Sequence, residues 1–287
     1  MTARDDAGRP VGYLSAIASH GRTTMFQHLA AVRGAQAGGA MVVELMKVTW
    51  AEPQFDYVKF YFLANNPYPS RIYGSFGEAF DDGETCIMRT VAHVVSTVDA
   101  PIGAIAPHLQ VRDASRSDLQ WVEAYIRRHE SPLLCLAEDL TADTLCLEDL
   151  NRRYGKAGLF RHRRVLIAYR DSDPVGFALA DVSSPGLNLS EGLSAFRTVV
   201  ADHALDLDVE IRAALVQAVQ QIYRDAGRRL LLGLVGVDET PAYLRLGFTA
   251  PAESRCILMH RSRFQDFAEH VGRLTRWRSR RFPGAAS

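Results

Sequence analysis

Two stretches of the chain carry nearly the same pattern of residues. Residues 4–17 read RDDAGRPVGYLSAI, and residues 170–182 read RDSDPVGFALADV. Each begins with acidic residues and a proline, which are typical of a turn, and continues with the apolar and β-forming residues of a strand. A match this short can arise by chance. A true internal repeat requires that the elements downstream are repeated as well.

The downstream elements do recur in the same order. In the first copy the pattern predicts a strand, a helix, a strand, a short helix and a strand at residues 23–33, 41–52, 56–64, 65–77 and 86–95. In the second copy the same series falls at residues 193–202, 209–227, 229–236, 238–248 and 255–262. The second long helix is the clearest, because Ile211, Leu215 and Val219 share one face and Gly227 stands where a helix would end.

The second copy also has an arm in front of it that the first copy lacks. The arm is predicted to form a strand at residues 108–115 and a helix at 115–130, with further helical sequence at 141–158. Either the first copy has no arm, or residue 1 lies downstream of the natural start, and the sequence leaves both open. Without an arm, strand edges near residues 1–14 need a cover, which a second subunit in a homodimer can supply.

Composition excludes several classes of protein. Of 287 residues, 47% are hydrophobic and 23% charged, which suits a globular protein with a sizeable core. Lysine plus arginine equals aspartate plus glutamate, at 33 each, so net charge gives no reason to expect nucleic acid. We expect no membrane span, no secretory signal and therefore a cytoplasmic protein. The four cysteines lack CxxC spacing, so we expect no metal.

The order of elements, together with two short motifs, resembles the GNAT acyltransferase superfamily. AYLRLGF at residues 242–248 is similar to the family's short helix ending in Tyr, three residues and Gly-Phe; IYGSFG at 72–77 has the same Tyr-to-Gly spacing without the Phe. The resemblance implies an α/β (mixed α+β) fold of two modules, each a mostly antiparallel twisted sheet flanked by helices. The first, shortened module covers 1–98, the complete one 106–262, and 263–287 forms a basic C-terminal helix or tail.

In this family the pyrophosphate of coenzyme A binds a glycine-rich loop at the start of a helix, where free N–H groups and the helix dipole favour an anion. The first copy reads VRGAQAGGA there, and an asparagine pair follows the next strand. The alternative is that both are plain turns. The resemblance implies these cofactor contacts: Val32, Arg33, Gly34, Gln36, Gly38, Gly39, Ala40 and Asn66.

The matching stretch of the second copy reads ADHALDLDVE, with four acids and no glycine. Carboxylates suit a helix N-terminus as caps, but they repel a pyrophosphate. We therefore expect a capped structural helix in the second copy and no coenzyme A bound there in the usual way.

Acyl transfer from a thioester to an amine requires a base for the amine and an acid for the leaving thiolate. Tyr73 matches the position where the family often carries the acid, and His28 is the candidate base, with His20 and Glu44 as alternatives. Each can equally be structural. For the acceptor, the resemblance points to Asn188, Glu191 and Tyr243 in the second copy, although the first two also suit a polar turn.

The sequence thus predicts a coenzyme-A-dependent N-acyltransferase acting on a small amine or amino compound, with acetyl-CoA or another acyl-CoA held in the first module. Two alternatives stay open: a catalytically inactive GNAT-like binding or regulatory protein, and an acyltransferase that uses an aminoacyl-tRNA or a carrier-protein thioester. The C-terminal arginines, including Arg273, favour a solvated basic tail over a nucleic-acid contact. Acceptor, acyl length and oligomeric state are not determined.

Overall fold

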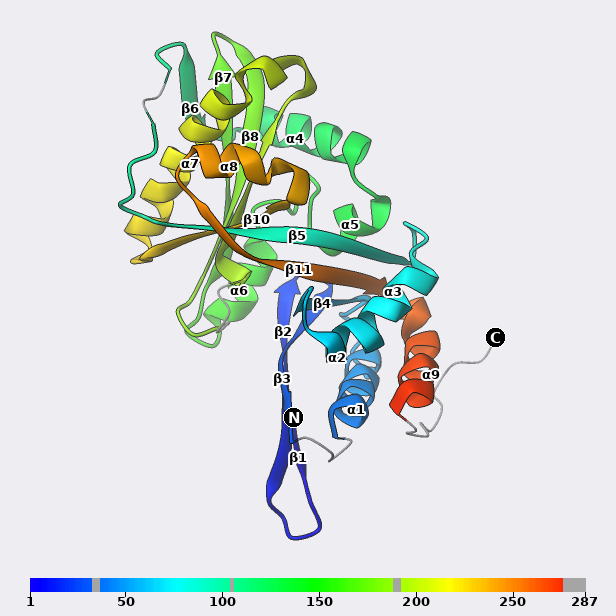
Figure 1. The fold of residues 1–287 in the computed structure, drawn as a ribbon. Coiled ribbons are helices and arrows are strands. Elements are labelled where there is room, and N and C mark those ends of the chain that lie inside the picture. Colours follow the sequence, from blue (N-terminus) through cyan, green and yellow to red (C-terminus); the bar gives the residue numbers. More distant parts are fainter. Residues whose placement is uncertain (33–36, 104–105, 188–191, 276–287) are drawn as a thin grey trace. The chain divides into compact units, whose positions relative to one another are not determined.

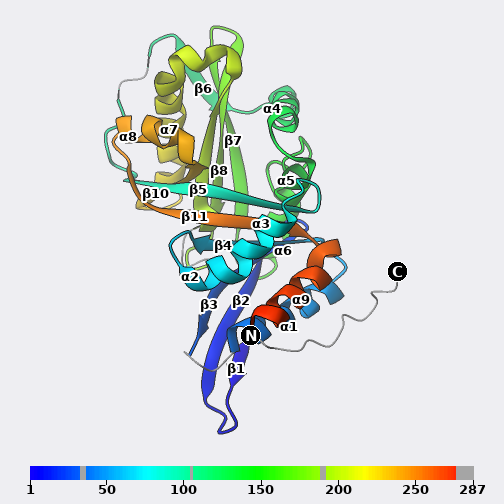
Figure 2. The same cartoon turned by 45° about the vertical axis from the view of Figure 1, so that its right-hand side comes forward.

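The computed structural model describes residues 1–32, 37–103, 106–187 and 192–275, shown from two sides in Figures 1 and 2. The chain forms two compact units: unit 1 comprises residues 1–89, 131–138 and 255–287, and unit 2 comprises 90–130 and 139–254. The boundary falls within strands β5 (Cys86–Thr97) and β11 (Thr249–His260). The predicted modules, 1–98 and 106–262, are consecutive segments, whereas these units interleave along the chain.

Unit 1 contains a mostly antiparallel sheet in the order β1-β2-β3-β4-β11-β5. Its first four strands are β1 (Thr2–Arg4), β2 (Pro10–His20), β3 (Thr23–Ala31) and β4 (Tyr57–Leu63). The turn predicted before β2 is confirmed: the Asp5 carboxylate accepts hydrogen bonds from the backbone N–H groups of Ala7 and Arg9. Gly8 completes this turn with a φ of +77°, which favours glycine.

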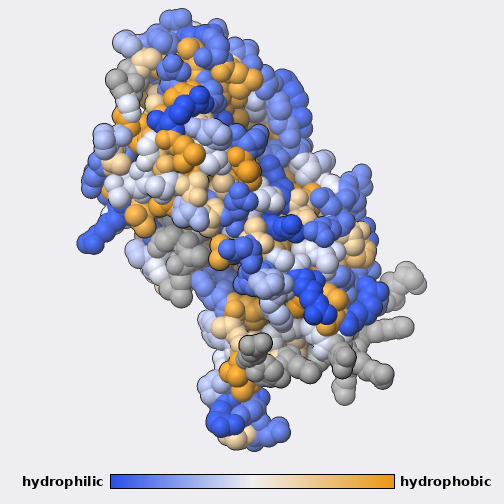
Figure 3. All heavy atoms as spheres, viewed as in Figure 1, coloured by the Kyte–Doolittle hydropathy of each residue, from blue (hydrophilic) through white to orange (hydrophobic). Residues whose placement is uncertain are grey.

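Strand β1 forms one edge of the sheet and is only three residues long. The tip of the β1–β2 hairpin carries charged residues and is hydrophilic in Figure 3. A short edge strand and charged residues both discourage pairing with another chain. Exposed apolar side chains do occur here, at Met1 and Tyr13, but the homodimer stays a prediction.

Helices cover both faces of the unit 1 sheet. On one face lie α1 (Ala37–Ala51) and α9 (Phe264–Thr275), together with the turns α2 (Pro67–Pro69), η1 (Ser70–Gly74) and α3 (Ser75–Phe80). On the other, α5 (Pro132–Ala137) supplies the carbonyl of Ala137 to the Thr23 hydroxyl. Residues of the predicted tail, 263–275, therefore form part of a folded unit, while 276–287 lie outside the described residues.

The core of unit 1 brings together residues from both ends of the chain. Strand β11 and helix α9 contribute Ile257, Met259, Phe264, Phe267, Ala268 and Val271 to the same apolar cluster as α1 and β4. The side chain of Phe267 contacts the rings of Phe60, Tyr73 and Phe76 at centroid distances of 5.0–5.9 Å. The C-terminal helix is thus an integral part of the core that supports β4.

Unit 2 contains the order β11-β5-β10-β9-β8-β7-β6. Its own strands are β6 (Leu109–Asp113), β7 (Arg161–Arg170), β8 (Asp173–Ser183), β9 (Ala195–Val200) and β10 (Leu230–Gly236). Alternation along β8 sends Ala178, Ala180 and Val182 into the main apolar cluster with α7. Phe177 points the other way, to Trp121 and Tyr125 of α4.

The helices of unit 2 follow the predicted order. They are α4 (Arg116–His129), α6 (Glu148–Gly155), α7 (Asp208–Asp225) and α8 (Thr240–Arg245), with 3₁₀ turns η2 (Gly192–Ser194), η3 (Asp202–Leu207) and η4 (Val237–Glu239). Helix α7 ends at Asp225, and Gly227 has a φ of +69°, as its sequence predicted. The mixed α+β class, with mostly antiparallel sheet flanked by helices, is confirmed. No helix in the described ranges is both long and apolar enough to cross a membrane.

Gly39 tests the packing of α1 against α9. A β-carbon at Gly39 would lie 2.8 Å from Thr275 Cγ2 and 3.2 Å from Val271 Cγ1. We expect Gly39→Ala to destabilise unit 1 by about 1–2 kcal/mol, because overpacking outweighs the better helix propensity of alanine. Urea denaturation measures this loss. In a Thr275→Ala background the cost should largely disappear; an equal cost in both backgrounds would contradict the contact.

Asp118 tests the start of α4 in unit 2. Burial raises the pKa of Asp118, but hydrogen bonds from Tyr169, Ser115 and Arg112 outweigh it and lower the pKa to about 2. The stabilisation is therefore present above about pH 4 and is lost as the pH falls toward 2. We expect Asp118→Asn to reduce the free energy of unfolding at pH 7 by about 1–2 kcal/mol and to flatten its acid dependence. The exposed Asp143→Asn is the control.

Candidate functional site

Strands β3 and β4 of unit 1 form a parallel pair that parts early. Hydrogen-bonded pairing joins residues 23–26 to residues 57–60, and residues 27–31 and 61–63 lie beyond it. Strand β3 also contains a bulge, because its register with β2 shifts between Tyr13–Ala30 and Ser15–Gln27. His28 lies in this bulge with a φ of +57°. A bulge bends a strand and turns its backbone groups aside, which is how sites beside sheets are often shaped.

Unit 2 has the same parallel arrangement without the bulge. Strands β9 and β10 pair only at residues 195–196 and 232–233. On its other side, β9 pairs with β8 in unbroken register from Phe196 to Val200. The two units therefore share the parting of parallel strands and differ in the local shape of the strand that borders it.

In each unit, we call the place where the two parallel strands separate the opening. In unit 2 a buried arginine bonds to β9 at this place, beyond the pairing of β9 with β10. Arg212, which is 6% exposed, donates to the backbone carbonyl and the hydroxyl of Thr198 on β9. The same guanidinium forms ion pairs of 2.8 Å with Asp208 and Glu239. Tyr243 of α8 completes the network through a 2.6 Å hydrogen bond to Thr198. The groups that border this opening are thus bonded to one another.

Tyr243, which the sequence analysis predicted to bind substrate, is a buried residue of α8. Its role in binding stays a prediction. The side chain is fully buried, and burial raises the pKa of its phenol. Its ring contacts Phe248 edge-on at 5.6 Å, and Gly247 between them has a φ of +84°. The other two predicted acceptor residues, Asn188 and Glu191, lie outside the described residues.

The start of α1 in unit 1 is uncharged. Residues 37–43 include no acid or base, in contrast to the start of α7. Of the predicted cofactor contacts, Gly38 and Gly39 are buried, Ala40 is half-buried and Val32 is exposed. Arg33, Gly34 and Gln36 lie outside the described residues. Gly39 packs against α9 as shown above, and Gly38 faces the hydroxyl of Tyr68.

Tyr73, the predicted acid, lies in the π-helical turn η1, a geometry often found at functional sites. Its ring stacks on Phe60 at 4.9 Å and contacts Phe62, which lies beyond the β3–β4 pairing. Burial raises the pKa of Tyr73 well above its usual value, and the phenol of Tyr68 raises it further. Among the described residues, no group forms a hydrogen bond with the Tyr73 hydroxyl.

The two Tyr-to-Gly motifs differ in structure. Gly247 follows the end of α8 with a positive φ. Gly77 lies inside α3, where a β-carbon would meet the side chain of Met88 at 2.8 Å. The equal spacing in the sequence therefore reflects a turn requirement in one unit and a packing requirement in the other.

The predicted bases occupy different environments. His28 is half-buried in the bulge. His20 is buried near the β2–β3 turn, with its Nδ1 3.2 Å from the Ser19 hydroxyl. It is about 15 Å along the strand from the bulge, at roughly 3.3 Å per residue. Glu44 is exposed and forms an ion pair with Lys47. Of the three candidates, the geometry therefore favours His28 as the base.

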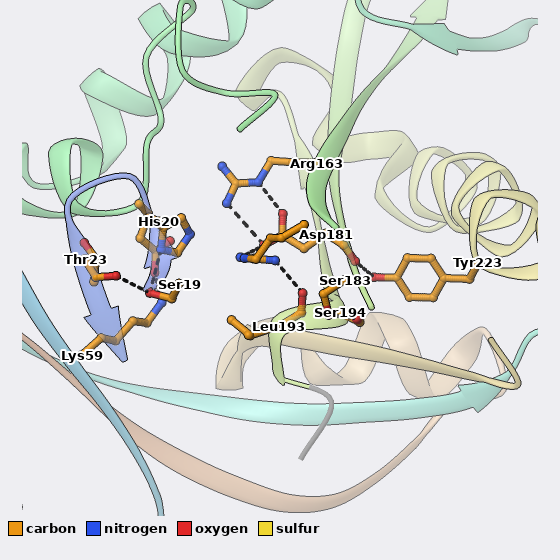
Figure 4. A network of polar contacts seen from close by, with 12 residues as sticks. Ser19, His20, Thr23, Lys59, Arg163, Asp181, Ser183, Leu193, Ser194 and Tyr223 are labelled. Carbon is orange, nitrogen blue, oxygen red and sulfur yellow. Dashed lines mark hydrogen bonds and ion pairs between the residues drawn. The ribbon is translucent and has the colours of Figure 1, made fainter. Parts of the chain in front are cut away.

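Each unit also holds a buried polar cluster, and Figure 4 draws both. In unit 1, Lys59 of β4 forms an ion pair with Glu138 next to α5. Burial lowers the pKa of Lys59, but the Glu138 carboxylate outweighs it and keeps the pKa above its ordinary value. In unit 2, Arg161 and Arg163 both bond Asp181. In the described part of the chain, no three His, Cys, Asp or Glu side chains are placed to hold a metal ion.

The sequence analysis missed Tyr68 and Arg212. Tyr68 stands between Pro67 and Pro69, two residues after Asn66, a pattern typical of a rigid helix start. Arg212 follows Asp208 by four residues, which is the spacing of a helical ion pair. Both signals were present, but neither shows which distant group the side chain meets.

No family model and no curated protein sequence matches the chain. Among solved structures, a Drosophila protein is similar at 14% identity and a TM-score of 0.50, covering 86% of this chain and 74% of its own. A conserved protein of unknown function from Staphylococcus epidermidis is similar at 12% identity and a TM-score of 0.50. The match covers 90% of this chain and 93% of that protein. A tandem GNAT protein from the clavulanic acid pathway is similar at 15% identity and a TM-score of 0.47. The match covers 90% of this chain and 81% of that protein.

At these identities the likeness concerns the fold alone. The mixed α+β fold predicted from the sequence is confirmed, since each unit has two parallel strands that are joined by a helix and separate early, in a mostly antiparallel sheet. That arrangement defines a class of fold and locates one opening in each unit. Which opening takes a ligand depends on the side chains described above.

Arg212 tests whether the unit 2 opening is closed by structure. We expect Arg212→Met to lower the free energy of unfolding by about 3 kcal/mol, because two carboxylates and a carbonyl lose their partner. Denaturation followed by tryptophan fluorescence measures it. Gln221→Met on the exposed face of α7 is the control and should cost less than about 0.5 kcal/mol. A variant as stable as the parent would contradict the network.

Proposed function

We propose that the chain is an N-acyltransferase that takes the acyl group from acetyl-CoA or another acyl-CoA and transfers it to a small amine. The donor thioester lies in unit 1, between the parting strands β3 and β4. One contrast carries this proposal: the unit 1 opening has a bulge and an uncharged helix start, whereas Arg212 occupies the unit 2 opening.

The chemistry follows from the residues at the unit 1 opening. The amine nitrogen bonds to the thioester carbonyl carbon, and a backbone N–H of the bulge stabilises the resulting oxyanion. His28 accepts the proton that the amine loses. The C–S bond then breaks, and Tyr73 donates its phenolic proton to the thiolate. Tyr73 is protonated at neutral pH before the thiolate leaves, since burial raises its pKa.

Tyr73→Phe tests the role of the acid. With acetyl-CoA as donor and a panel of primary amines, we expect kcat to fall about 100-fold while donor affinity is unchanged. Thiol release measured with a chromogenic disulfide gives the rate. Tyr223→Phe, which removes a similarly buried hydroxyl from α7 of unit 2, should keep most of the activity. Equal loss in both variants would contradict a catalytic role for Tyr73.

Two other functions give different results in the same experiments. A catalytically inactive binding protein, which uses the same groove for another ligand, releases no thiol from acetyl-CoA with any amine. An enzyme that takes an aminoacyl-tRNA or a carrier-protein thioester shows no saturable binding of acetyl-CoA by calorimetry but transfers the acyl group from its own donor. Calorimetry with acetyl-CoA therefore comes first.

A further inference from the structure

The C-terminal helix α9 contacts the turn that carries Tyr73 at two places in unit 1, and it lies beside α3 in Figures 1 and 2. The ring of Phe267 stacks on that of Tyr73 with their centroids 5.9 Å apart. One helical turn later, Nε2 of His270 lies 3.1 Å from the backbone carbonyl oxygen of Ile72, the residue directly before Tyr73. The same helix therefore contacts both the ring of Tyr73 and the backbone beside it.

The surroundings of His270 show which ring nitrogen carries the proton. A carbonyl oxygen can only accept, so Nε2 donates to Ile72. The same nitrogen lies 3.0 Å from the Ser75 hydroxyl, which donates its own proton to the carbonyl of Arg71 and is therefore free to accept. Burial lowers the pKa of His270, although the hydrogen bond to Ile72 opposes this, so the ring is neutral at neutral pH. One neutral imidazole thus bonds two groups of the same turn.

These hydrogen bonds matter because Tyr73 lies in the π-helical turn η1, a rare geometry that occurs most often at functional sites. The turn α2, directly before η1, is capped by Asn66, whose side-chain oxygen accepts a 3.3 Å hydrogen bond from the Tyr68 backbone N–H. The cofactor contact of Asn66 stays a prediction. In η1 itself, the carbonyls of two consecutive residues accept the side-chain hydrogen bonds described above. Side chains therefore hold this segment at its start and again beside Tyr73.

We propose that His270 is a positioning residue for Tyr73, because its hydrogen bond to the Ile72 carbonyl fixes the π-helical turn from which Tyr73 protonates the leaving thiolate. This inference rests on the proposed function, since it concerns the acid of the same reaction. It adds a residue of the C-terminal helix, which follows both predicted modules, to those that determine the rate. An acid displaced by about 1 Å can slow a reaction about 100-fold, so a hydrogen bond that fixes the turn affects kcat.

The test compares three replacements of His270 in the thiol-release assay with acetyl-CoA. His270→Leu keeps the bulk and removes the donor, and His270→Asn has an amide on a side chain too short to reach Ile72. His270→Gln places an amide N–H close to the former Nε2 and can donate to the same carbonyl. We expect kcat to fall about tenfold in the Leu and Asn variants, with KM for acetyl-CoA unchanged, and to stay within about threefold of the parent in the Gln variant.

His260→Leu is the matched control. His260 is likewise half-buried, and it caps η5 (Arg261–Arg263), the turn before α9, by accepting a hydrogen bond from the Ser262 backbone N–H. Its loss should lower the free energy of unfolding, as the loss of a cap does, but leave kcat unchanged. Urea denaturation of every variant, with rates measured where each is fully folded, separates an effect on stability from an effect on the reaction.

A double variant links His270 to Tyr73. In a Tyr73→Phe background, His270→Leu should have no further effect on kcat, because the two residues act through one phenol.

The outcomes separate the two proposals. If the wild-type protein releases thiol, three results overturn this inference alone: a parental kcat in the Leu variant, a Gln variant no faster than the Leu variant, or the same fall of kcat in the Tyr73→Phe background. An equal fall of kcat in His260→Leu also overturns it, since the effect would then be one of general stability. Wild-type protein that releases no thiol from acetyl-CoA with any amine overturns the proposed function, and this inference with it.

Discussion

The parallel pairing of β3 with β4 ends after residue 26, and the arrangement of unit 1 follows from that early end. Beyond this point, β3 and β4 no longer pair with each other, although each keeps its neighbour on the other side of the sheet. The bulge at His28 increases the bend of β3. Helix α1 begins shortly after β3, and η1 follows β4. The start of α1 and Tyr73 therefore both lie after the strands that separate.

Unit 2 shows how the same arrangement can be closed. Arg212 donates hydrogen bonds to the carbonyl and the hydroxyl of Thr198 on β9, and Asp208 and Glu239 neutralise its charge. A buried guanidinium is tolerated because its donors are matched by acceptors. The difference between the two units is therefore one of side chains placed on a common backbone plan, which is why fold similarity alone does not assign a function.

Interleaving of the chain explains how unit 1 is completed. Residues 131–138 cover one face of its sheet, and α9 covers part of the other. Apolar surface that a short module would leave exposed is buried by segments remote in sequence. The aromatic contacts of Phe267 with Phe60 and Tyr73 tie the C-terminal helix to the candidate site.

Local signals were enough to predict much of this protein. The sequence predicted the turn around Asp5, the long helix α7 with Gly227 after it, and the mixed α+β class. These features were predictable because turn chemistry and periodicity act over a few residues. Candidate residues such as Tyr73 and His28 were named from position and resemblance.

What the sequence by itself determined was the kind and order of elements; only the tertiary structure decided what each side chain meets. That Gly39 packs against Thr275, that Asn66 holds Tyr68 over Gly38, and that Arg212 closes the second opening depend on contacts between segments distant in sequence. Such contacts arise from the burial of apolar surface and the pairing of buried polar groups across the whole fold, and no local pattern encodes them.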